Sequence, residues 1–249
     1  MFMDIKGKVH SIDSFGSADG PGVRFLIFLH GCPFRCQFCH NPDTWGSEKY
    51  EEKTADELLR QAIRYKDYWG DIGGITVSGG EPLMQIDFLL DLFKKAKKYH
   101  INTCIDTSGA CFTRKEPWFS KFNELMEYTD LLLLDIKEIN NERHKVITGQ
   151  SNENVLDMAT YLSDINKPVW IRHVLVPERS DYDEDLLALR DFIKLLKNVE
   201  RVEVLPYHTL GVYKWKELGL DYALEDIDPP KADRIANANA ILETQSYRK

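Results

Sequence analysis

Compact runs of apolar residues alternate along this chain with segments in which apolar residues recur every three or four positions. The runs predict buried strands, and the periodic segments predict amphipathic helices. Strands are expected over residues 23–30, 75–78, 102–106, 131–137, 169–176 and 201–206. Helices are expected over residues 54–69, 86–99 and 117–128, in stretches up to 162, and over 183–196 and 229–243. The first helix opens with Thr54 and Glu57 in capping-box spacing, and the last has a proline at its start.

This alternation gives six β/α units. The run LLLL at 131–134 is apolar throughout, which is typical of a strand in a parallel sheet that is covered on both faces. No linker rich in Gly, Ser or Pro divides the chain, so we expect one domain over residues 1–249, with its core at about 16–245. An open barrel of six units and a doubly wound sheet both fit this pattern.

Polar or reactive residues lie within, end or follow each of the six expected strands. They are the cysteines after the first strand, residues 78–81, residues 106–109, Asp135 with Lys137, Arg172 with His173, and Tyr207 with His208. Ligands of parallel α/β folds bind at the carboxyl ends of the strands, so this edge is the predicted site. Because side chains alternate along a strand, Asp135 and Lys137 are expected to face one way. Arg172 and His173 are expected to face opposite ways, with His173 structural.

Three of the five cysteines form a C-x3-C-x2-C run, at Cys32, Cys36 and Cys39. An iron–sulfur cubane normally takes four protein thiolates, so this run would leave one iron open to a small molecule. A zinc knuckle would instead need a fourth protein ligand, and the adjacent His40 is poorly placed to supply it. Cys104 and Cys111 lie far away and are expected to be ordinary thiols, with Cys104 buried in the strand at 102–106.

Composition narrows the class of protein. With 43% hydrophobic and 29% charged residues, the chain is expected to be globular, and it has no apolar run near the ~20 residues of a membrane span. A net charge of −8 argues against nucleic-acid binding, and the lysines at 94, 95, 97 and 98 are expected on the solvated face of a helix. An odd number of cysteines and the lack of an apolar signal core indicate a cytoplasmic protein without a disulfide framework.

The cysteine spacing, with Phe38 directly before the third cysteine, resembles that of radical S-adenosylmethionine (SAM) enzymes. Further motifs resemble the family of pyruvate formate-lyase-activating enzymes, which belong to the activases of glycyl radical enzymes. These motifs are DGPGVR (19–24), CHNPDTW (39–45), SGGEPL (78–83), LDIK (134–137), VWIR (169–172) and VLPYH (204–208). The short connection from Trp45 to the first helix leaves no room for a ferredoxin-like insert, which favours the small, single-cluster activases. The resemblance implies a partial (β/α)6, TIM-like open barrel.

The resemblance also implies cofactors and their ligands. Cys32, Cys36 and Cys39 would hold a [4Fe–4S] cluster, and SAM would chelate its fourth iron. The reduced cluster would cleave SAM to methionine and a 5′-deoxyadenosyl radical. The implied SAM contacts are Phe38, Cys39, His40, Gly79, Gly80, Glu81, Asp135, Ile136, Lys137, Arg172 and His208. Alternatives are a tight turn for the glycines, a place in the core for Phe38, and a contact with the substrate peptide for Arg172.

Two carboxylates held close raise each other's pKa unless a cation lies between them. Asp106 and Asp135 stand at the ends of two expected strands and could face each other in this way. The resemblance implies a monovalent cation there, with backbone oxygens of Thr107 and Leu133 as further ligands. The alternative is a pair of solvated carboxylates.

By resemblance, the enzyme is an oxidoreductase of anaerobic glucose metabolism whose substrate is a glycine of pyruvate formate-lyase. The radical would remove one α-hydrogen from that glycine to leave a glycyl radical. A flavodoxin or ferredoxin would donate the electron, and the chain would act as a monomer, with residues 13–19 and 207–213 at the substrate opening. Alternatives are activation of another glycyl radical enzyme, radical SAM chemistry on a small molecule, and an electron carrier without SAM cleavage.

Overall fold

The computed structural model describes residues 5–46 and 49–247, which divide into two compact units. The first unit consists of Met1–Cys32, Thr44–Thr107 and Cys111–Leu133. The second unit consists of Pro33–Asp43, Ser108–Ala110 and Leu134–Lys249. The predicted single domain over 1–249 stays a prediction, and the two units are described separately below.

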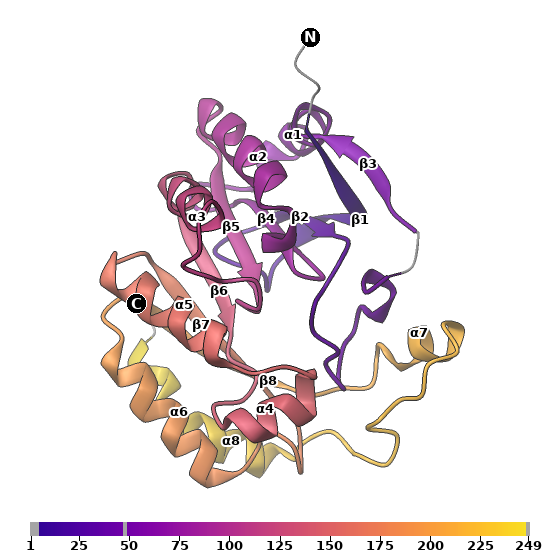
Figure 1. Cartoon of the computed structure of the whole chain (residues 1–249), viewed down its shortest axis with the longest axis vertical. Helices are drawn as coiled ribbons and strands as arrows, with labels where there is room; N and C mark the ends of the chain where they lie inside the picture. Colours follow the sequence, from indigo (N-terminus) through magenta and orange to yellow (C-terminus); the bar gives the residue numbers. More distant parts are fainter. Residues whose placement is uncertain (1–4, 47–48, 248–249) are drawn as a thin grey trace. The chain divides into compact units, whose positions relative to one another are not determined.

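In its described residues, the first unit contains five strands and three α-helices. The strands are β1 (Lys6–Gly16), β2 (Arg24–Leu29), β3 (Glu51–Thr54), β4 (Gly74–Gly79) and β5 (Asn102–Thr107). The helices are α1 (Ala55–Ile63), α2 (Ile86–Lys98) and α3 (Trp118–Glu127), and they lie beside one another along the strands (Figure 1). Strands β2, β4 and β5 are parallel, whereas β1 runs antiparallel to both β2 and β3. Near-continuous burial along β2 and β4 confirms the apolar pattern of parallel strands.

A buried arginine closes the amino ends of the parallel strands in the first unit. Arg24, the first residue of β2, is fully buried. Its Nε donates to Thr76 Oγ1 at 2.9 Å on β4, and one terminal nitrogen donates to Asn102 Oδ1 at 2.8 Å on β5. Another terminal nitrogen donates to the carbonyl of Ile75. The guanidinium therefore joins three neighbouring strands at the end away from the predicted ligand edge.

The part of the second unit that the structure describes contains two further strands and five α-helices. They are β7 (Val169–Leu175), β8 (Val199–Pro206), α4 (Asn141–Thr148), α5 (Glu153–Asp164), α6 (Asp183–Leu195), α7 (Val212–Glu217) and α8 (Ala232–Ile241). Strands β7 and β8 are parallel, and α6 packs against α8 (Figure 1). Strand β6 (Leu131–Asp135) starts in the first unit and ends in the second. The strand order is β3-β1-β2-β4-β5-β6-β7-β8, which is an open sheet.

The six expected strands are confirmed as β2, β4, β5, β6, β7 and β8, and the expected α/β class is confirmed. Two strands were not expected. β1 is half-exposed with alternating polar residues, and β3 (EEKT) has no large apolar residue, so neither contains a compact apolar run. These strands form the antiparallel edge of the sheet, where burial on both faces is not required.

Three element boundaries differ from the prediction. β6 ends at Asp135, so the expectation that Lys137 lies on this strand is wrong. The helix expected over 54–69 stops at Ile63, and a separate 3-10 turn follows at Lys66–Tyr68. The last helix starts at Ala232, so its proline pair lies before the helix instead of at its start. The capping box of Thr54 at the start of α1 is confirmed.

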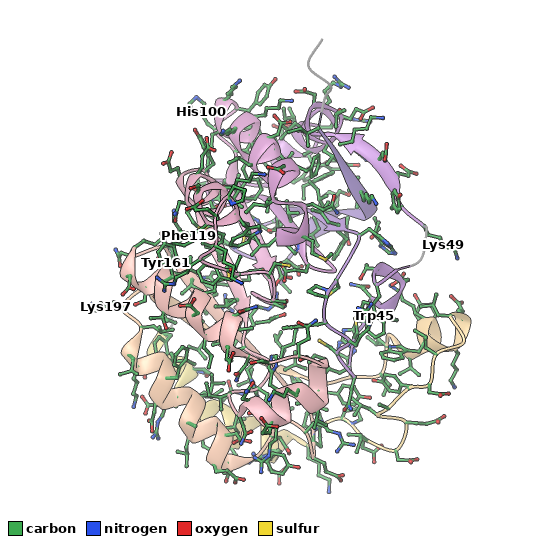
Figure 2. All side chains as sticks on the ribbon, in the orientation of Figure 1. Trp45, Lys49, His100, Phe119, Tyr161 and Lys197 are labelled. Carbon is green, nitrogen blue, oxygen red and sulfur yellow. The ribbon has the colours of Figure 1, made fainter. Side chains whose placement is uncertain are left out.

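The lysine run lies on α2 and has a structural explanation. Lys94, Lys95 and Lys97 form ion pairs with carboxylates on neighbouring elements of the first unit. Figure 2 shows the side chain of His100 at the outer end of this helix. The run is therefore a charged outer face of the unit. Within the described ranges, no helix combines the length and the apolar character that a membrane crossing requires.

Candidate active site

In the first unit, hydrogen bonds connect the carboxyl ends of β4 and β5. Ser78 Oγ donates to Asp106 Oδ2 at 2.7 Å, and Thr107 Oγ1 donates to Glu81 Oε1 at 2.6 Å. Glu81 is fully buried and also accepts the backbone N–H of Leu83 at 3.0 Å. The predicted polar edge is thus present in this unit. The carboxylate of Glu81 has a structural function there, because it ties two strand ends together.

Gly79 and Gly80 bring the chain close to the start of the cysteine loop. Gly79 has a φ of 123°, and a Cβ on it would lie 2.3 Å from backbone atoms of Leu29. A Cβ on Gly80 would lie 2.1 Å from the carbonyl oxygen of Gly31. The N–H groups of Gly80 and Glu81 donate to the carbonyls of Leu29 and Gly31, at 2.9 and 2.7 Å. The tight turn explains both glycines, and a ligand contact of this segment stays a prediction.

In the second unit, Asp135 and Lys137 form an ion pair at the end of β6. Lys137 Nζ lies 3.0 Å from Asp135 Oδ2 although it is no longer on the strand. Burial raises the pKa of the Asp135 carboxyl, but Lys137 and then Arg172 outweigh this effect and hold the pKa below its ordinary value. Among the described residues, the buried Oδ1 of Asp135 has no hydrogen-bond partner. This oxygen can therefore accept a hydrogen bond from a ligand or bind a cation.

Lys137 also lies near the ring and the thiol of the cysteine loop. Its Nζ lies 5.4 Å from the centroid of the Phe38 ring, which is almost fully buried. Burial raises the pKa of the Cys36 thiol to about 12, while the positive charge of Lys137 opposes this rise. The thiol is therefore protonated at neutral pH, and a metal must displace its proton on binding. The contact of Phe38 with an adenine stays a prediction.

None of the five cysteines, all of which lie in the described ranges, forms a disulfide. Cys36 is buried, and Cys32 and Cys39 are half-buried. In the part of the chain that the structure describes, no three His, Cys, Asp or Glu side chains are grouped around one position suited to a metal ion. A cubane is a larger ligand with several irons, so its thiolates need not converge on one point. Cys104 is fully buried in β5, which confirms the expectation for this residue.

The first half of the cysteine loop is anchored on the last turn of α4. The backbone N–H groups of Arg35 and Gln37 donate to the carbonyls of Thr148 and Ile147, at 2.8 and 2.9 Å. Gln150 adds a side-chain hydrogen bond to the carbonyl of Pro33 at 2.7 Å. The carbonyls of Ile147 and Thr148 can accept these bonds because α4 ends there and leaves them without intrahelical donors.

The second half of the loop is anchored by side chains from the segment after β8. Trp215 Nε1 donates to the carbonyl of Cys39 at 2.9 Å. Lys214 Nζ donates to Asn41 Oδ1 at 2.9 Å and lies 3.2 Å from a carboxylate oxygen of Asp43. Sequence reasoning missed both residues, because α7 has only six residues and no clear apolar period.

His40 and His208 are in direct contact in the second unit. Their rings stack with centroids 4.1 Å apart, and His40 Nε2 donates to the carbonyl of His208 at 3.2 Å. Burial lowers the pKa of His40, so its ring is neutral at pH 7. A contact of either ring with SAM stays a prediction.

Ile136 and His173 show how β7 supports the end of β6. The N–H of Ile136 donates to the carbonyl of Arg172 at 3.0 Å, and its own carbonyl accepts from His173 Nδ1 at 2.9 Å. His173 Nε2 lies 2.8 Å from the carbonyl of Ser180, and the residue is almost fully buried. This arrangement agrees with the structural function expected of His173. The predicted ligand contacts of Ile136 and Arg172 stay predictions, as does the backbone contact of Leu133, which is buried in β6.

The model of the Radical SAM superfamily matches residues 26–193 of this chain, and the chain belongs to that superfamily. Its relatives include proteins named pyruvate formate-lyase-activating enzyme. The one from Streptococcus mutans is 53% identical over 247 residues, covering 98% of this chain and 94% of the relative. The one from Listeria monocytogenes is 52% identical over 246 residues, covering 98% of this chain and 99% of the relative.

Solved structures support the fold. The peptide-bound SuiB of Streptococcus suis matches with a TM-score of 0.67 and 20% identity, covering 96% of this chain and 49% of that one. A domain of a pyruvate-formate lyase-activating enzyme from Bacteroides vulgatus matches with a TM-score of 0.58 and 22% identity, covering 71% of this chain and 96% of that one. At these identities, the likeness concerns the fold alone.

Enzymes of this superfamily use a [4Fe–4S] cluster and SAM, and this chain is an enzyme of that class. The residues present fit these groups. The cysteine loop supplies three thiols that form no disulfide, and the buried Oδ1 of Asp135 is available to a polar ligand.

Proposed function

We propose that this chain activates pyruvate formate-lyase by forming a glycyl radical on it. The observation that carries this proposal is the identity of 53% to a relative of that name, spread over 98% of the chain. A shared superfamily alone would fix only the type of chemistry. Similarity over nearly the full length of both chains also supports the same partner.

The three thiols of the cysteine loop would hold the cluster, because Cys32, Cys36 and Cys39 stand within eight residues of one another. When bound, the cluster supplies the electron for reductive cleavage of SAM. The contribution of the chain is to bind, orient and shield these groups. The positive charge of Lys137 near Cys36 favours the thiolate form that a metal needs.

The polar ends of the strands would bind SAM. The N–H groups of Gly80 and Glu81 are already used within the first unit, so this segment would meet the amino group of SAM with carbonyl oxygens. In the second unit, Asp135 Oδ1 would accept a hydroxyl of the ribose, and Lys137 or Arg172 would pair with the SAM carboxylate. Phe38, His40, Ile136 and His208 complete the proposed contacts.

A monovalent cation at Asp106 and Asp135, with backbone oxygens of Thr107 and Leu133, is part of the proposal. Asp135 Oδ1 supports it from the second unit. In the first unit, one oxygen of Asp106 already accepts a hydrogen bond from Ser78. If a cation binds there, replacing K⁺ and Na⁺ with a large organic cation lowers the activity, and an unchanged rate removes this part of the proposal.

The partner would present a glycine-bearing segment, from which one α-hydrogen is removed. We further propose that flavodoxin or ferredoxin donates the electron, and that the chain acts as a cytoplasmic monomer with a single catalytic domain. These finer points follow from the same resemblance to the activases.

The decisive experiment is anaerobic reconstitution of the cluster, followed by addition of SAM, a reductant and purified pyruvate formate-lyase. The electron paramagnetic resonance (EPR) spectrum is then recorded. A glycyl radical doublet is the expected result. If 5′-deoxyadenosine forms without a doublet, the partner is wrong and the chemistry stands. If neither product forms although the cluster is intact, the proposed function fails.

A further inference from the structure

Tyr207 and His208, the two residues after β8, each connect to the cysteine loop by a separate route. In the first route, the hydroxyls of Tyr207 and Tyr222 lie 2.8 Å apart. The rings of Tyr222 and Trp215 then pack edge to face, with centroids 5.1 Å apart and an interplanar angle of 71°. Trp215 Nε1 finally donates to the carbonyl of Cys39 at 2.9 Å.

Burial shields the hydrogen bonds of this first route from water. Tyr207 and Trp215 are 1% and 5% exposed, so water cannot easily replace their hydrogen bonds. Burial raises the pKa of Tyr222, with the hydrogen bond to Tyr207 as a further cause, and the phenol therefore stays neutral and can donate. A buried donor that loses its acceptor carries a desolvation penalty, so the indole N–H holds the Cys39 carbonyl in place.

The second route passes through His208, whose ring stacks on that of His40. A Cβ on Gly211 would lie 2.8 Å from the Cα of His40, so only glycine lets the segment come so close. Next to it, Lys214 bonds to the side chains of Asn41 and Asp43. The segment after β8 thus holds residues 39–43 by contacts with Cys39 itself and with three of the residues that follow it.

The sulfur of Cys39 depends on this arrangement. The backbone N–H of Asn41 points to Cys39 Sγ at 3.4 Å. Trp215 fixes the carbonyl of Cys39, and Lys214 fixes the side chain of Asn41, so together they set the geometry of this N–H···S contact. Hydrogen bonds to cysteine sulfurs are among the factors that set the reduction potential of an iron–sulfur cluster.

We propose that Trp215, assisted by Lys214, is a positioning residue for the third cluster thiolate and a determinant of the cluster potential. This inference rests on the proposed function of Cys39 as a cluster ligand. Loss of the indole N–H frees the Cys39 carbonyl and loosens the N–H···S contact. The cluster then loses iron faster, and its potential falls because the reduced form is less stabilised.

The test compares Trp215→Phe with Trp69→Phe in the full chain after anaerobic reconstitution. Both tryptophans are buried, but Trp69 Nε1 has no hydrogen-bond partner among the described residues, so only Trp215→Phe removes a donor in use. Phenylalanine keeps a ring against Tyr222. Iron release to a chelator is expected to be about 2- to 10-fold faster in Trp215→Phe, the range of one net hydrogen bond. Its midpoint potential is expected to shift down, and that of Trp69→Phe to stay unchanged.

A second pair of variants covers the case in which Trp215→Phe does not fold. Lys214→Met removes the bonds to Asn41 and Asp43, and Lys216→Met changes an exposed lysine of the same helix. A lower potential in Lys214→Met alone supports the proposal. Equal iron release and equal potentials in each variant and its control overturn it. If the wild-type chain itself binds no cluster, the proposed function fails instead, so the two failures can be told apart.

Discussion

The two halves of the cysteine loop are held in different ways. Residues 33–37 rest mainly on backbone hydrogen bonds to the carbonyls at the end of α4. Residues 39–43 are held by side chains, with Trp215, Lys214 and His208 as their partners. Backbone bonds tolerate many substitutions as long as the helix end stays in place. Side-chain contacts can be removed one at a time, so the second half is the part that evolution or an experimenter can tune.

Burial also makes the stability near the two halves depend on pH in opposite directions. Before α4, the fully buried Glu138 accepts the N–H of Asn140, and burial raises the pKa of this carboxyl to about 7. In the second half, burial lowers the pKa of His40. A rise in pH therefore destabilises the surroundings of the first half, and a fall in pH destabilises those of the second half.

The largest effect is expected when one cluster thiol is removed from either half. Cys36→Ala and Cys39→Ala should each reduce SAM cleavage to background, because two thiolates cannot replace the three that the cluster needs. The measurement is 5′-deoxyadenosine formed after anaerobic reconstitution. Cys111→Ala, which removes a half-buried thiol outside the loop, is the control and should keep its activity. Turnover in either loop variant would refute the assignment of the cluster ligands.

Glu138→Gln should remove the pH dependence of stability that comes from the surroundings of the first half. The pKa of Glu138 is about 7 in the folded chain, against an ordinary value of 4.5, so the unfolded state binds fewer protons between these values. Stability is therefore lost as pH rises through this window, by about 3 kcal/mol at pH 8. Glutamine cannot ionise, and it keeps an acceptor for Asn140. Urea unfolding at pH 5.5 and pH 8 should show the smaller loss in Glu138→Gln, whereas the exposed Glu153→Gln should behave like the wild type.

Gly149→Ala and Gly219→Ala compare the two anchors under equal backbone strain. Both glycines follow a helix with positive φ, 83° after α4 and 66° after α7. A Cβ at either position meets no atom closer than 3.9 Å, so the cost is conformational and about 1 kcal/mol in each case. If the first half depends on the end of α4, Gly149→Ala releases iron faster than the wild type. An equal response of both variants in stability and iron release would remove the distinction between the anchors.

His40→Gln should give the smallest effect, and only at low pH. The lowered pKa of His40 means that the unfolded chain takes up its proton first, so stability falls as pH drops through about 6.5. Burial also lowers the pKa of His144 and His173, so the wild type has further losses of the same sign. The variant should lose less stability than the wild type between pH 7.5 and pH 5.5. Identical pH profiles would show that the stacked pair does not matter for acid stability.

The sequence predicts much of this molecule where one residue type recurs or one spacing is strict. The parallel strands follow from apolar runs such as RFLIFL, and the cysteine loop follows from its spacing. Strand β3 was not predicted because EEKT has no apolar pattern. Strand β1 was not predicted because it is half-exposed and its polar residues interrupt any apolar run. The anchor at Trp215 could not be predicted either, since 176 positions separate it from its hydrogen-bond partner Cys39. Lys137 shows a further limit, because an ion pair with Asp135 formed although the strand had already ended.

Because of Arg24, the two ends of the parallel strands in the first unit are stabilised by different contacts. Its guanidinium links β2, β4 and β5 at their amino ends, and separate hydrogen bonds donated by Ser78 and Thr107 link β4 and β5 at their carboxyl ends. One set of stabilising contacts thus lies where no ligand is expected, away from the predicted site. Substitutions at the carboxyl ends of β4 and β5 therefore leave the contacts of the Arg24 guanidinium in place.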